Sequence, residues 1–190
     1  MLEKVLIEEA VSEGKSLARL DKLVVFIEGG VPGDVADLKI TKVKSNYLEA
    51  RVVYVHEASK HRLTPFCEHF GTCGGCIWQH MDYEMQLVYK TKQVEDVLQR
   101  LGKVELPEVF PIIRSEKTKF YRNRLDFAFS NKRWLTKEEI SQDKRFDDPA
   151  LGFHVPKRFD KILDINKCWL QDDLSNKIRL TIKEIALKPV

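Results

Sequence analysis

The segment that decides how this chain is organised spans residues 67–76 and reads Cys-Glu-His-Phe-Gly-Thr-Cys-Gly-Gly-Cys. Its cysteines, Cys67, Cys73 and Cys76, have the spacing C-x5-C-x2-C, and the fourth cysteine of the chain is Cys168. Four thiolates brought together make a donor set that suits a [4Fe–4S] cluster or a tetrahedral zinc ion. We therefore expect the four cysteines to converge on one site and to hold two distant segments of the chain together.

The spacing favours the cluster over zinc. Structural zinc sites usually take their ligands from two close C-x2-C pairs, whereas three clustered cysteines and one distant cysteine are more typical of an iron–sulfur cluster. A zinc site in which His69 or His80 replaces a cysteine stays open as an alternative, and so does a set of free cysteines. Gly71, Gly74 and Gly75 fit a loop around a bulky group, because glycine tolerates positive φ and exposes N–H groups to sulfides.

Upstream of the cysteines, short apolar runs alternate with turn-forming residues. We predict strands over residues 4–11, 23–28, 35–44 and 47–55, with turns at 29–34 and 45–46. Four or five short strands in so short a stretch predict a small closed β-barrel of the oligonucleotide-binding type over residues 1–57. The fold class is therefore α+β, with the barrel followed by a cysteine-rich segment and helix over 58–103 and an antiparallel, β-rich central domain over 104–190.

Downstream of the cysteines, a helix is predicted to begin at the N-cap Asp82 and to end at Gly102. The residues that recur at helical spacing are Tyr83, Leu87, Val94, Leu98 and Leu101. A final helix is predicted to hold four apolar residues: Leu174, Ile178, Ile182 and Ile185.

Between these helices apolar residues recur at every second position, which is the spacing of a strand. A half-buried strand is predicted from residue 121, with one face made by Tyr121, Leu125, Phe127 and Phe129 and the other by Arg122, Arg124 and Asp126. Further strands are predicted over 151–155 and 162–165. Residues 131–149, which include Trp134, Lys144 and Arg145, are expected to form a variable surface loop, with an RNA contact as the second reading.

The positive charge of the chain is segregated along the sequence. The net charge is only +3, but residues 39–62 carry six basic and two acidic side chains, and residues 117–133 carry six basic side chains and one acidic. Segregated positive charge is the pattern expected of a protein that binds a polyanion, although two solvated faces would give the same pattern. Arg122 and Arg124 could equally pair with Asp126 on the surface.

No stretch of the sequence indicates a membrane protein or a secreted one. Apolar runs stay far short of the ~20 residues that a membrane-spanning helix needs, and the N-terminus lacks a signal-peptide pattern. A cytoplasmic protein is therefore expected, and clustered cysteines in that setting indicate a metal or redox site before disulfides.

Several separate stretches resemble one family, the bacterial RNA (uracil-5-)methyltransferases with an N-terminal TRAM domain, and most closely the type that methylates 23S ribosomal RNA. Residues 13–19 (Glu-Gly-Lys-Ser-Leu-Ala-Arg), 25–27 and 31–34 (Val-Pro-Gly-Asp) resemble the TRAM signature. Residues 73–80 and the following helix resemble the cluster motif of the family. Residues 120–124 (Phe-Tyr-Arg-Asn-Arg), 152–154 and 164–170, which contain Cys168, resemble the central domain and the fourth cluster ligand.

The resemblance implies a role for each part of the chain. In that family the TRAM and central domains hold RNA, and a C-terminal Rossmann-like domain supplies the S-adenosylmethionine site, the attacking cysteine and the base. Neither a glycine-rich donor motif nor a fifth cysteine is present here, so we expect no catalytic residue and no activity from these 190 residues alone. They resemble the RNA-binding, [4Fe–4S]-bearing region of such an enzyme, monomeric and directed to ribosomal RNA, with phosphate or base contacts expected from Arg122, Arg124, Lys42, Lys44 and Arg51.

Two other classes of protein stay open. One is a stand-alone iron–sulfur module for electron transfer or iron sensing, and the other is a zinc-ribbon RNA-binding module. Cys168 stands 92 positions beyond Cys76, an arrangement suited to locking two segments together. An electron carrier would more naturally hold all four ligands on one compact loop.

Overall fold

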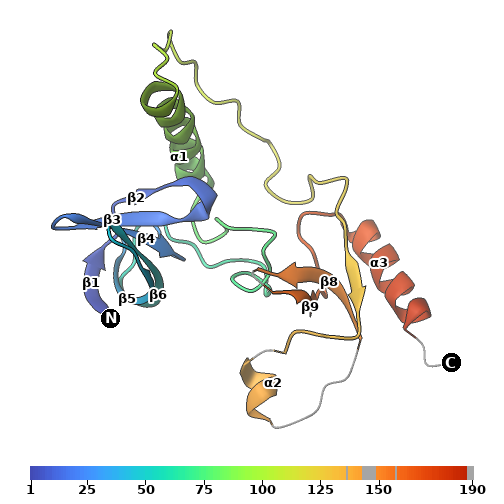
Figure 1. Ribbon diagram of the computed structural model, residues 1–190. Helices are drawn as coiled ribbons and strands as arrows, with labels where there is room; N and C mark the ends of the chain where they lie inside the picture. Colours follow the sequence, from blue (N-terminus) through green and yellow to red (C-terminus); the bar gives the residue numbers. More distant parts are fainter. Residues whose placement is uncertain (136, 143–148, 157, 188–190) are drawn as a thin grey trace. The chain divides into compact units, whose positions relative to one another are not determined.

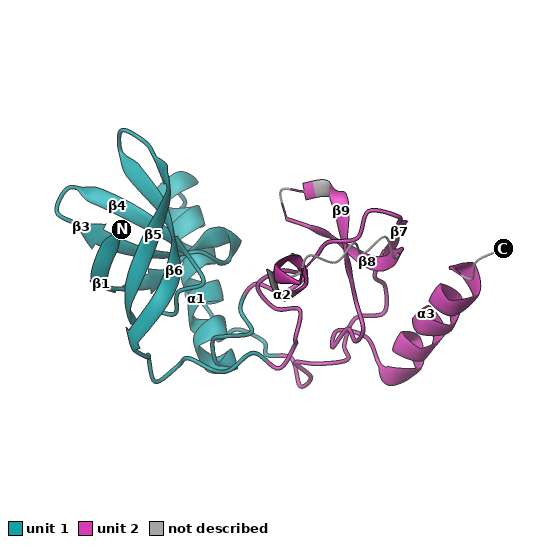
Figure 2. Cartoon of the chain, turned by 90° about the horizontal axis from the view of Figure 1, so that it is seen from below, with its two compact units in different colours: residues 1–65, 78–114 teal, residues 66–77, 115–190 magenta. Residues whose placement is uncertain are grey.

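The chain forms a strand-rich N-terminal half and a mixed C-terminal half, as the ribbon in Figure 1 shows. The computed structural model describes residues 1–135, 137–142, 149–156 and 158–187. They divide into two compact units, which Figure 2 colours separately. Unit 1 comprises residues 1–65 and 78–114, and unit 2 comprises residues 66–77 and 115–190. The units therefore divide the chain differently from the predicted segments 1–57, 58–103 and 104–190, because residues 66–77, here called the cysteine loop, group with the C-terminal half.

Unit 1 is built on a six-stranded sheet with the order β1-β5-β6-β4-β3-β2. The strands are β1 (Leu2–Leu6), β2 (Glu9–Ala10), β3 (Ser16–Leu20), β4 (Leu23–Glu28), β5 (Val35–Val43) and β6 (Tyr47–Glu57). Strand β4 pairs with β6 in parallel, and the other neighbours are antiparallel.

The two edges of this sheet are joined by one bent strand. At the bend between β1 and β2, Ile7 N donates to Asp34 O over 2.8 Å and Glu8 N donates to Leu17 O over 2.9 Å. These bonds extend the β1–β5 pairing on one side and the β2–β3 pairing on the other, so the sheet closes into the predicted small barrel. Its core contains Val5, Ile7, Ala18, Val25, Ile27, Ala36, Leu38 and Ala50.

Strand β3 was not predicted from the sequence. Its first three residues, Ser16, Leu17 and Ala18, are all buried, so the strand shows no alternation of buried and exposed positions. Ser16 is satisfied because its Oγ donates to Gly30 O over 2.8 Å. The pairing of β3 with β4 depends on this satisfied polar residue and cannot be recognised from a period of two.

The buried carboxylate of Asp34 fixes one end of the barrel to the segment that follows β6. Its oxygens accept hydrogen bonds from Val31 N (2.7 Å), Ser59 N (2.9 Å) and Arg62 Nη2 (2.6 Å). Burial alone would raise the pKa of Asp34, but the Arg62 guanidinium and the two N–H groups hold that pKa below its usual value. Gly33 adopts φ +95° here, and a Cβ at this position would lie 2.9 Å from Ser59 Oγ.

Helix α1 (Tyr83–Asp96) begins where the sequence predicts. Met85 N donates to the Asp82 carboxylate over 2.8 Å, and the helix continues as the π-helical turn η2 (Val97–Leu101) before Gly102. Of the residues at helical spacing, Leu87 is buried, whereas Val94, Leu98 and Leu101 are exposed. The cluster that includes this helix is formed by Ala10, Val31, Met81 and Tyr89, and the buried residues of α1, Leu87 and Tyr89, lie near the middle of the helix.

Unit 2 contains a three-stranded antiparallel sheet with the order β7-β8-β9, together with helices α2 (Lys137–Ser141) and α3 (Asp173–Ala186). The strands are β7 (Ala128–Ser130), β8 (Ala150–Val155) and β9 (Arg158–Asp164). Helix α3 starts at the N-cap Asp172, whose carboxylate accepts from Ser175 N over 2.7 Å. The core comprises Val155, Leu163, Ile165, Cys168 and Leu170, and Leu125, Phe127 and Trp134 pack against it.

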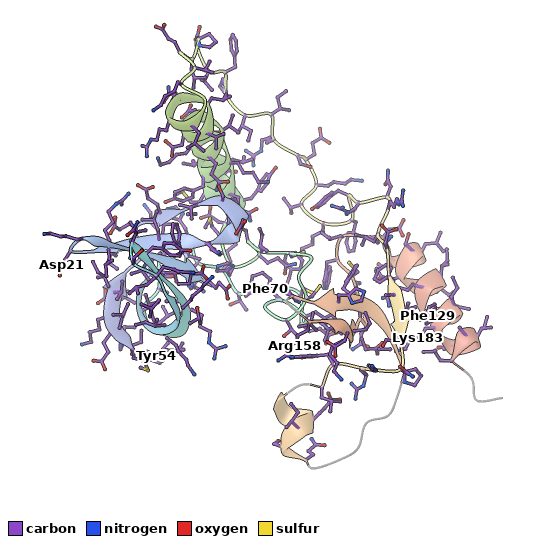
Figure 3. The ribbon with its side chains drawn as sticks, in the orientation of Figure 1. Asp21, Tyr54, Phe70, Phe129, Arg158 and Lys183 are labelled. Carbon is purple, nitrogen blue, oxygen red and sulfur yellow. The ribbon has the colours of Figure 1, made fainter. Side chains whose placement is uncertain are left out.

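The predicted strand from residue 121 is wrong over most of its length. Regular pairing begins only at Ala128, and Tyr121 and Phe129 are about half exposed; Phe129 is labelled in Figure 3. Upstream, Phe120 N donates to Trp169 O and Arg122 N donates to Leu170 O, both over 2.9 Å. The segment thus pairs with a loop instead of a strand, which is why only part of the alternating pattern faces the core.

The predicted last helix is observed as α3, but the face that carries its four predicted apolar residues is exposed. The four apolar residues of that face are each about half exposed or more, whereas Asn176 and Arg179 are buried. In the stretch 131–149, Trp134 lies in an irregular segment and packs against the core, while Lys144 and Arg145 lie outside the described residues. Within the described part of the chain, no helix has the length and apolar character needed to cross a membrane.

The Asp34 carboxylate gives unit 1 a pH-dependent contribution to stability. Asp34→Asn leaves the Arg62 guanidinium without its counter-charge and is expected to lower the free energy of unfolding at pH 7 by about 3 kcal/mol. Because the folded pKa of Asp34 is lowered, its ionised form stabilises the fold above the unfolded pKa of about 4, and this stabilisation is lost as pH falls further.

The difference in the free energy of unfolding between wild type and Asp34→Asn should therefore narrow below about pH 4. Urea unfolding followed by circular dichroism between pH 7 and pH 3 measures it. Asp21→Asn, in the exposed turn between β3 and β4, is the matched control and should change little. A difference that stays constant with pH would contradict the assigned role of Asp34.

Candidate metal centre and nucleic-acid surfaces

The four cysteines all lie in unit 2. Cys168 is part of the buried core, and Cys73 and Cys76 pack against that core. Burial raises the pKa of Cys67 and of Cys73, and the charges that Cys76 and Cys168 would carry raise both values further. The cysteine loop, residues 66–77, and the segment 165–170 therefore bring thiols into one another's electrostatic range.

The cysteine loop is shaped by short-range hydrogen bonds. Cys73 N and Thr72 N both donate to His69 O, over 2.8 and 3.2 Å, and Phe70 N donates to Cys67 O over 3.1 Å. Gly75 N points at Cys73 Sγ over 3.4 Å, so one backbone N–H already faces a thiol.

The three glycines of the loop differ in their roles. Gly71 has φ +84°, but Gly74 and Gly75 have no positive φ, so the expected backbone reason holds only for Gly71. Gly74 is needed for space, since a Cβ there would lie 2.9 Å from the Pro156 ring. An open pocket of about 640 Å³ adjoins this side of the loop and is lined by Gly74, Gly75, Phe153, His154, Pro156 and Arg158 (Arg158 is labelled in Figure 3).

Helix α3 holds the segment 165–170, which contains Cys168, through two buried polar side chains. Asn176 Oδ1 accepts from Cys168 N over 2.8 Å, and Asn176 Nδ2 donates to Cys168 O over 2.9 Å. The Arg179 guanidinium donates to Ile165 O and, over 3.0 Å, to Asn166 O. Sequence reasoning missed both residues, because a polar position on an amphipathic helix is normally assigned to solvent.

Arg179 also brings a buried positive charge close to the thiols. Arg179 is only 5% exposed, and its guanidinium carbon lies 4.9 Å from the centre of the Phe127 ring. Burial lowers the pKa of Arg179, while the charges of Cys168 and Asp164 act in the opposite direction. A negative group bound by the cysteines would therefore find a compensating cation in the surrounding protein.

Thiols brought together in unit 2 are potential ligands for a metal-containing group. Among the described residues, no group of three or more His, Cys, Asp or Glu side chains is arranged to hold one metal ion. Around one zinc ion, thiolate sulfurs at Zn–S distances of about 2.3 Å would lie about 3.8 Å apart. A cubane cluster would stand between its cysteines and space them more widely. The thiols of Cys67 and Cys73, which burial desolvates, and the buried Arg179 fit such an anionic group in their chemistry.

The two histidines weighed as zinc ligands have other partners. His69 Nε2 accepts from Asn166 N over 3.2 Å, and burial lowers the pKa of His69. His80 belongs to unit 1, where its Nε2 lies 3.3 Å from Gly30 O and burial likewise lowers its pKa.

The basic residues singled out on the barrel lie on one hairpin. Lys42 and Lys44 are exposed at the end where β5 turns into β6, and Lys42 Nζ lies 3.7 Å from Glu49 Oε1. Arg51 of β6 stands opposite Lys39 of β5, and both are exposed. Like charges placed opposite each other destabilise a bare sheet, but they suit a surface that meets a polyanion.

Arg122 and Arg124 lie in unit 2, in the extended segment before β7 and not on a strand. Arg122 Nε donates to Arg124 O over 3.2 Å. Arg124 pairs with Asp126 over 3.4 Å, with both side chains more than 85% exposed (87% and 86%). An ion pair that is this exposed contributes little to stability. The pairing therefore does not commit either arginine to a structural role.

The comparison with protein families concerns the barrel. Residues 3–53 match the model of the TRAM domain, which covers the strands from β1 to most of β6. The barrel is TRAM-like. The predicted N-terminal domain of this type is therefore confirmed, while the TRAM-like barrel by itself accounts for little more than a quarter of the chain.

The chain is also homologous to proteins named RNA methyltransferases. It is 55% identical over 176 residues to an uncharacterized RNA methyltransferase of Bacteroides thetaiotaomicron, covering 92% of this chain and 39% of that protein. It is 46% identical over 186 residues to one of Porphyromonas gingivalis, covering 96% of this chain and 40% of that protein. The chain thus spans about two fifths of the length of these relatives.

A solved structure shares the fold over nearly the whole chain. It is the crystal structure of Pyrococcus abyssi tRNA (uracil-54, C5)-methyltransferase in complex with S-adenosyl-L-homocysteine. The TM-score is 0.53 at 22% identity, over 95% of this chain and 36% of that one. The combination of the TRAM-like barrel with the second unit therefore occurs in a known protein.

Proposed function

We propose that this chain is the RNA-binding, [4Fe–4S]-bearing N-terminal region of an S-adenosylmethionine-dependent RNA (uracil-5-)methyltransferase that acts on ribosomal RNA. The observation that carries the proposal is that relatives named RNA methyltransferases align along more than 90% of this chain. The alignment includes both units, so the proposal rests on more than the TRAM-like barrel.

RNA binding by this chain is supported from both units. The TRAM-like barrel presents Lys42, Lys44 and Arg51 on its β5–β6 hairpin, and unit 2 presents Arg122 and Arg124 on an exposed extended segment. Exposed cations of this kind supply phosphate contacts, which give affinity and position a nucleic acid without reading its sequence.

The cluster is proposed on Cys67, Cys73, Cys76 and Cys168. When bound, it supplies iron–thiolate bonds that join the cysteine loop to the segment 165–170. Asn176 holds the backbone of Cys168 in place, Gly75 N–H is directed at the Cys73 sulfur, and Arg179 offsets negative charge from within the core. These residues act by holding and orienting the thiolates.

The first expected outcome concerns RNA affinity and its salt dependence. The chain should bind a single-stranded or hairpin RNA, and each phosphate contact should add about −0.7 to the slope of log K against log salt. Changing both Arg122 and Arg124 to Ala should lower affinity and flatten the slope by about 1.4, because two contacts are lost. A triple change of Lys42, Lys44 and Arg51 to Ala should act in the same direction.

Fluorescence anisotropy at several salt concentrations measures these slopes, with Lys22→Ala in the β3–β4 turn as the control. A ribosomal hairpin and a tRNA of equal length serve as alternative ligands, since the solved relative of similar fold is a tRNA enzyme. Binding that does not depend on salt, or an unchanged slope in both the double and the triple variant, would contradict the proposed phosphate contacts.

The second expected outcome concerns the metal content. Protein purified without oxygen should contain about four iron and four sulfide ions per chain, and changing any one of the four cysteines to Ser should abolish them. Asn176→Ala should make the iron easier to remove by a chelator, because Cys168 loses its buried backbone partner. Lys177→Ala, exposed on the same helix, is the control.

Iron and sulfide analysis with the visible absorption spectrum decides this point. One equivalent of zinc without iron would keep the four-thiolate site and overturn the cluster. A full complement of iron in the Cys168→Ser variant would show that the fourth ligand is wrongly assigned.

The third expected outcome concerns methyl transfer by the longer protein to which this chain is proposed to belong. That protein should transfer the methyl group of S-adenosylmethionine to C5 of a uracil in ribosomal RNA, whereas these 190 residues alone should transfer none. Radiolabelled S-adenosylmethionine followed by nucleoside analysis measures the product. Methylation of tRNA but not of ribosomal RNA would correct the target, and methylation by the 190-residue chain would contradict the proposed division of roles.

A further inference from the structure

Three aromatic rings gather in unit 2 beside the cysteine segments. The centre of the Trp169 ring lies 5.6 Å from that of Phe66, in an edge-to-face arrangement, and 5.7 Å from that of Phe120. Phe66 directly precedes Cys67, and Trp169 directly follows Cys168. These rings are not a closed core, because Phe66 and Phe120 are each 38% exposed and Trp169 is only half-buried.

Two lysines lie against the same rings. Lys119 Nζ lies 4.1 Å from the centre of the Phe66 ring and 4.9 Å from that of Trp169. Lys167 Nζ lies 4.4 Å from the centre of Trp169 and 5.7 Å from that of Phe120. Lys167 also pairs with Asp173 over 2.8 Å, but this pair is exposed and a phosphate could displace the carboxylate at little cost.

The backbone at Phe120 is strained in a way that keeps its ring in this group. Phe120 has φ +57°, in the left-handed region that bulky residues rarely adopt, at a cost of about 1 kcal/mol or more. The hydrogen bond from Phe120 N to Trp169 O, over 2.9 Å, fixes the residue there. A strained backbone that carries a partly exposed ring is more typical of a binding surface than of a packing contact.

We propose that Phe66, Phe120 and Trp169, with Lys119 and Lys167, form a platform that binds a nucleotide of single-stranded RNA. An unpaired base would stack on the exposed aromatic surface, and the two ammonium groups would meet the adjoining phosphates. Aromatic rings interleaved with cations recognise single strands because every base has a π-face and every nucleotide a charge. This inference rests on the proposed RNA-binding function, and it adds a site and a class of substrate, an unpaired segment.

The alternative is that the rings merely close the loops around the cysteines. The two readings differ in what Lys119 and Lys167 do, because cations that only cover rings would leave RNA affinity unchanged when removed. They also differ in the preference for single strands, since a surface that attracts phosphates alone would bind a duplex of equal charge at least as well.

The experiment uses fluorescently labelled single-stranded RNA of eight nucleotides and an RNA duplex of the same total charge. Wild type should bind the single strand more tightly, and Trp169→Ala should weaken that binding about tenfold, the loss expected for one stacked base. Trp169→Phe should keep most of the affinity, because a ring remains. Changing both Lys119 and Lys167 to Ala should flatten the salt slope by about 1.4, with Lys177→Ala as the matched control.

Tryptophan fluorescence gives a direct reading of contact. RNA should quench the emission of wild type more than that of Trp169→Phe, whereas Trp134→Phe, a change in the packed core, should leave the quenching unchanged. Circular dichroism and cysteine reactivity confirm that each variant is folded. If Trp169→Ala fails to fold, Trp169→Phe and the double lysine variant still carry the test.

Failure of this inference is distinguishable from failure of the proposed function. Normal RNA binding and an unchanged salt slope in both the Trp169 and the double lysine variants would overturn the platform and leave the proposed RNA binding intact. No RNA binding by wild type at low salt would overturn both. Equal affinity for the duplex, or for polyglutamate of equal charge, would show simple attraction of polyanions and would also overturn the stacking site.

Discussion

Unit 2 depends on the contact between the cysteine loop, residues 66–77, and the segment 165–170. The hydrophobic core at this contact is small, and Cys168 is one of its few fully packed members. Helix α3 strengthens it with polar groups, since Asn176 and Arg179 satisfy backbone atoms of the segment 165–168 that would otherwise be buried without partners. The thiols, the half-exposed rings and the flanking lysines are all positioned by this one contact.

The barrel could be predicted from the sequence because its information is local. Strands β4, β5 and β6 show the expected apolar runs between turn residues, and Asp82 caps α1 because an N-cap interaction spans only three residues. Strand β3 could not be predicted in this way, since it buries three consecutive residues and one of them is a serine that needs a distant carbonyl. Likewise, nothing near Asp34 in the sequence identifies Arg62 as its partner.

In unit 2 the same reasoning failed where tertiary hydrogen bonds override the pattern. Helix α3 is amphipathic in sequence, yet it buries Asn176 and Arg179 and leaves Ile178 about half exposed. A polar side chain that satisfies several backbone groups at once can replace an apolar one in a core, and no periodicity signals that exchange. The spacing of the cysteines, by contrast, singles out candidate ligands in advance, because donor chemistry is a property of the residue type. Lys119 and Lys167 were missed because they are far apart in sequence and meet only through Trp169.

Neither unit is one continuous stretch of chain. The chain belongs to unit 1 up to residue 65, to unit 2 over 66–77, to unit 1 again over 78–114 and finally to unit 2 (Figure 2). Genetic recombination between residues 78 and 114 would therefore join the cysteine loop of one parent to the Cys168 segment of another. It would also separate the barrel from part of the segment 78–114, which belongs to the same unit. Shuffling of this region as independent modules is disfavoured, so the barrel and the thiol-bearing unit are expected to be inherited as a single genetic block.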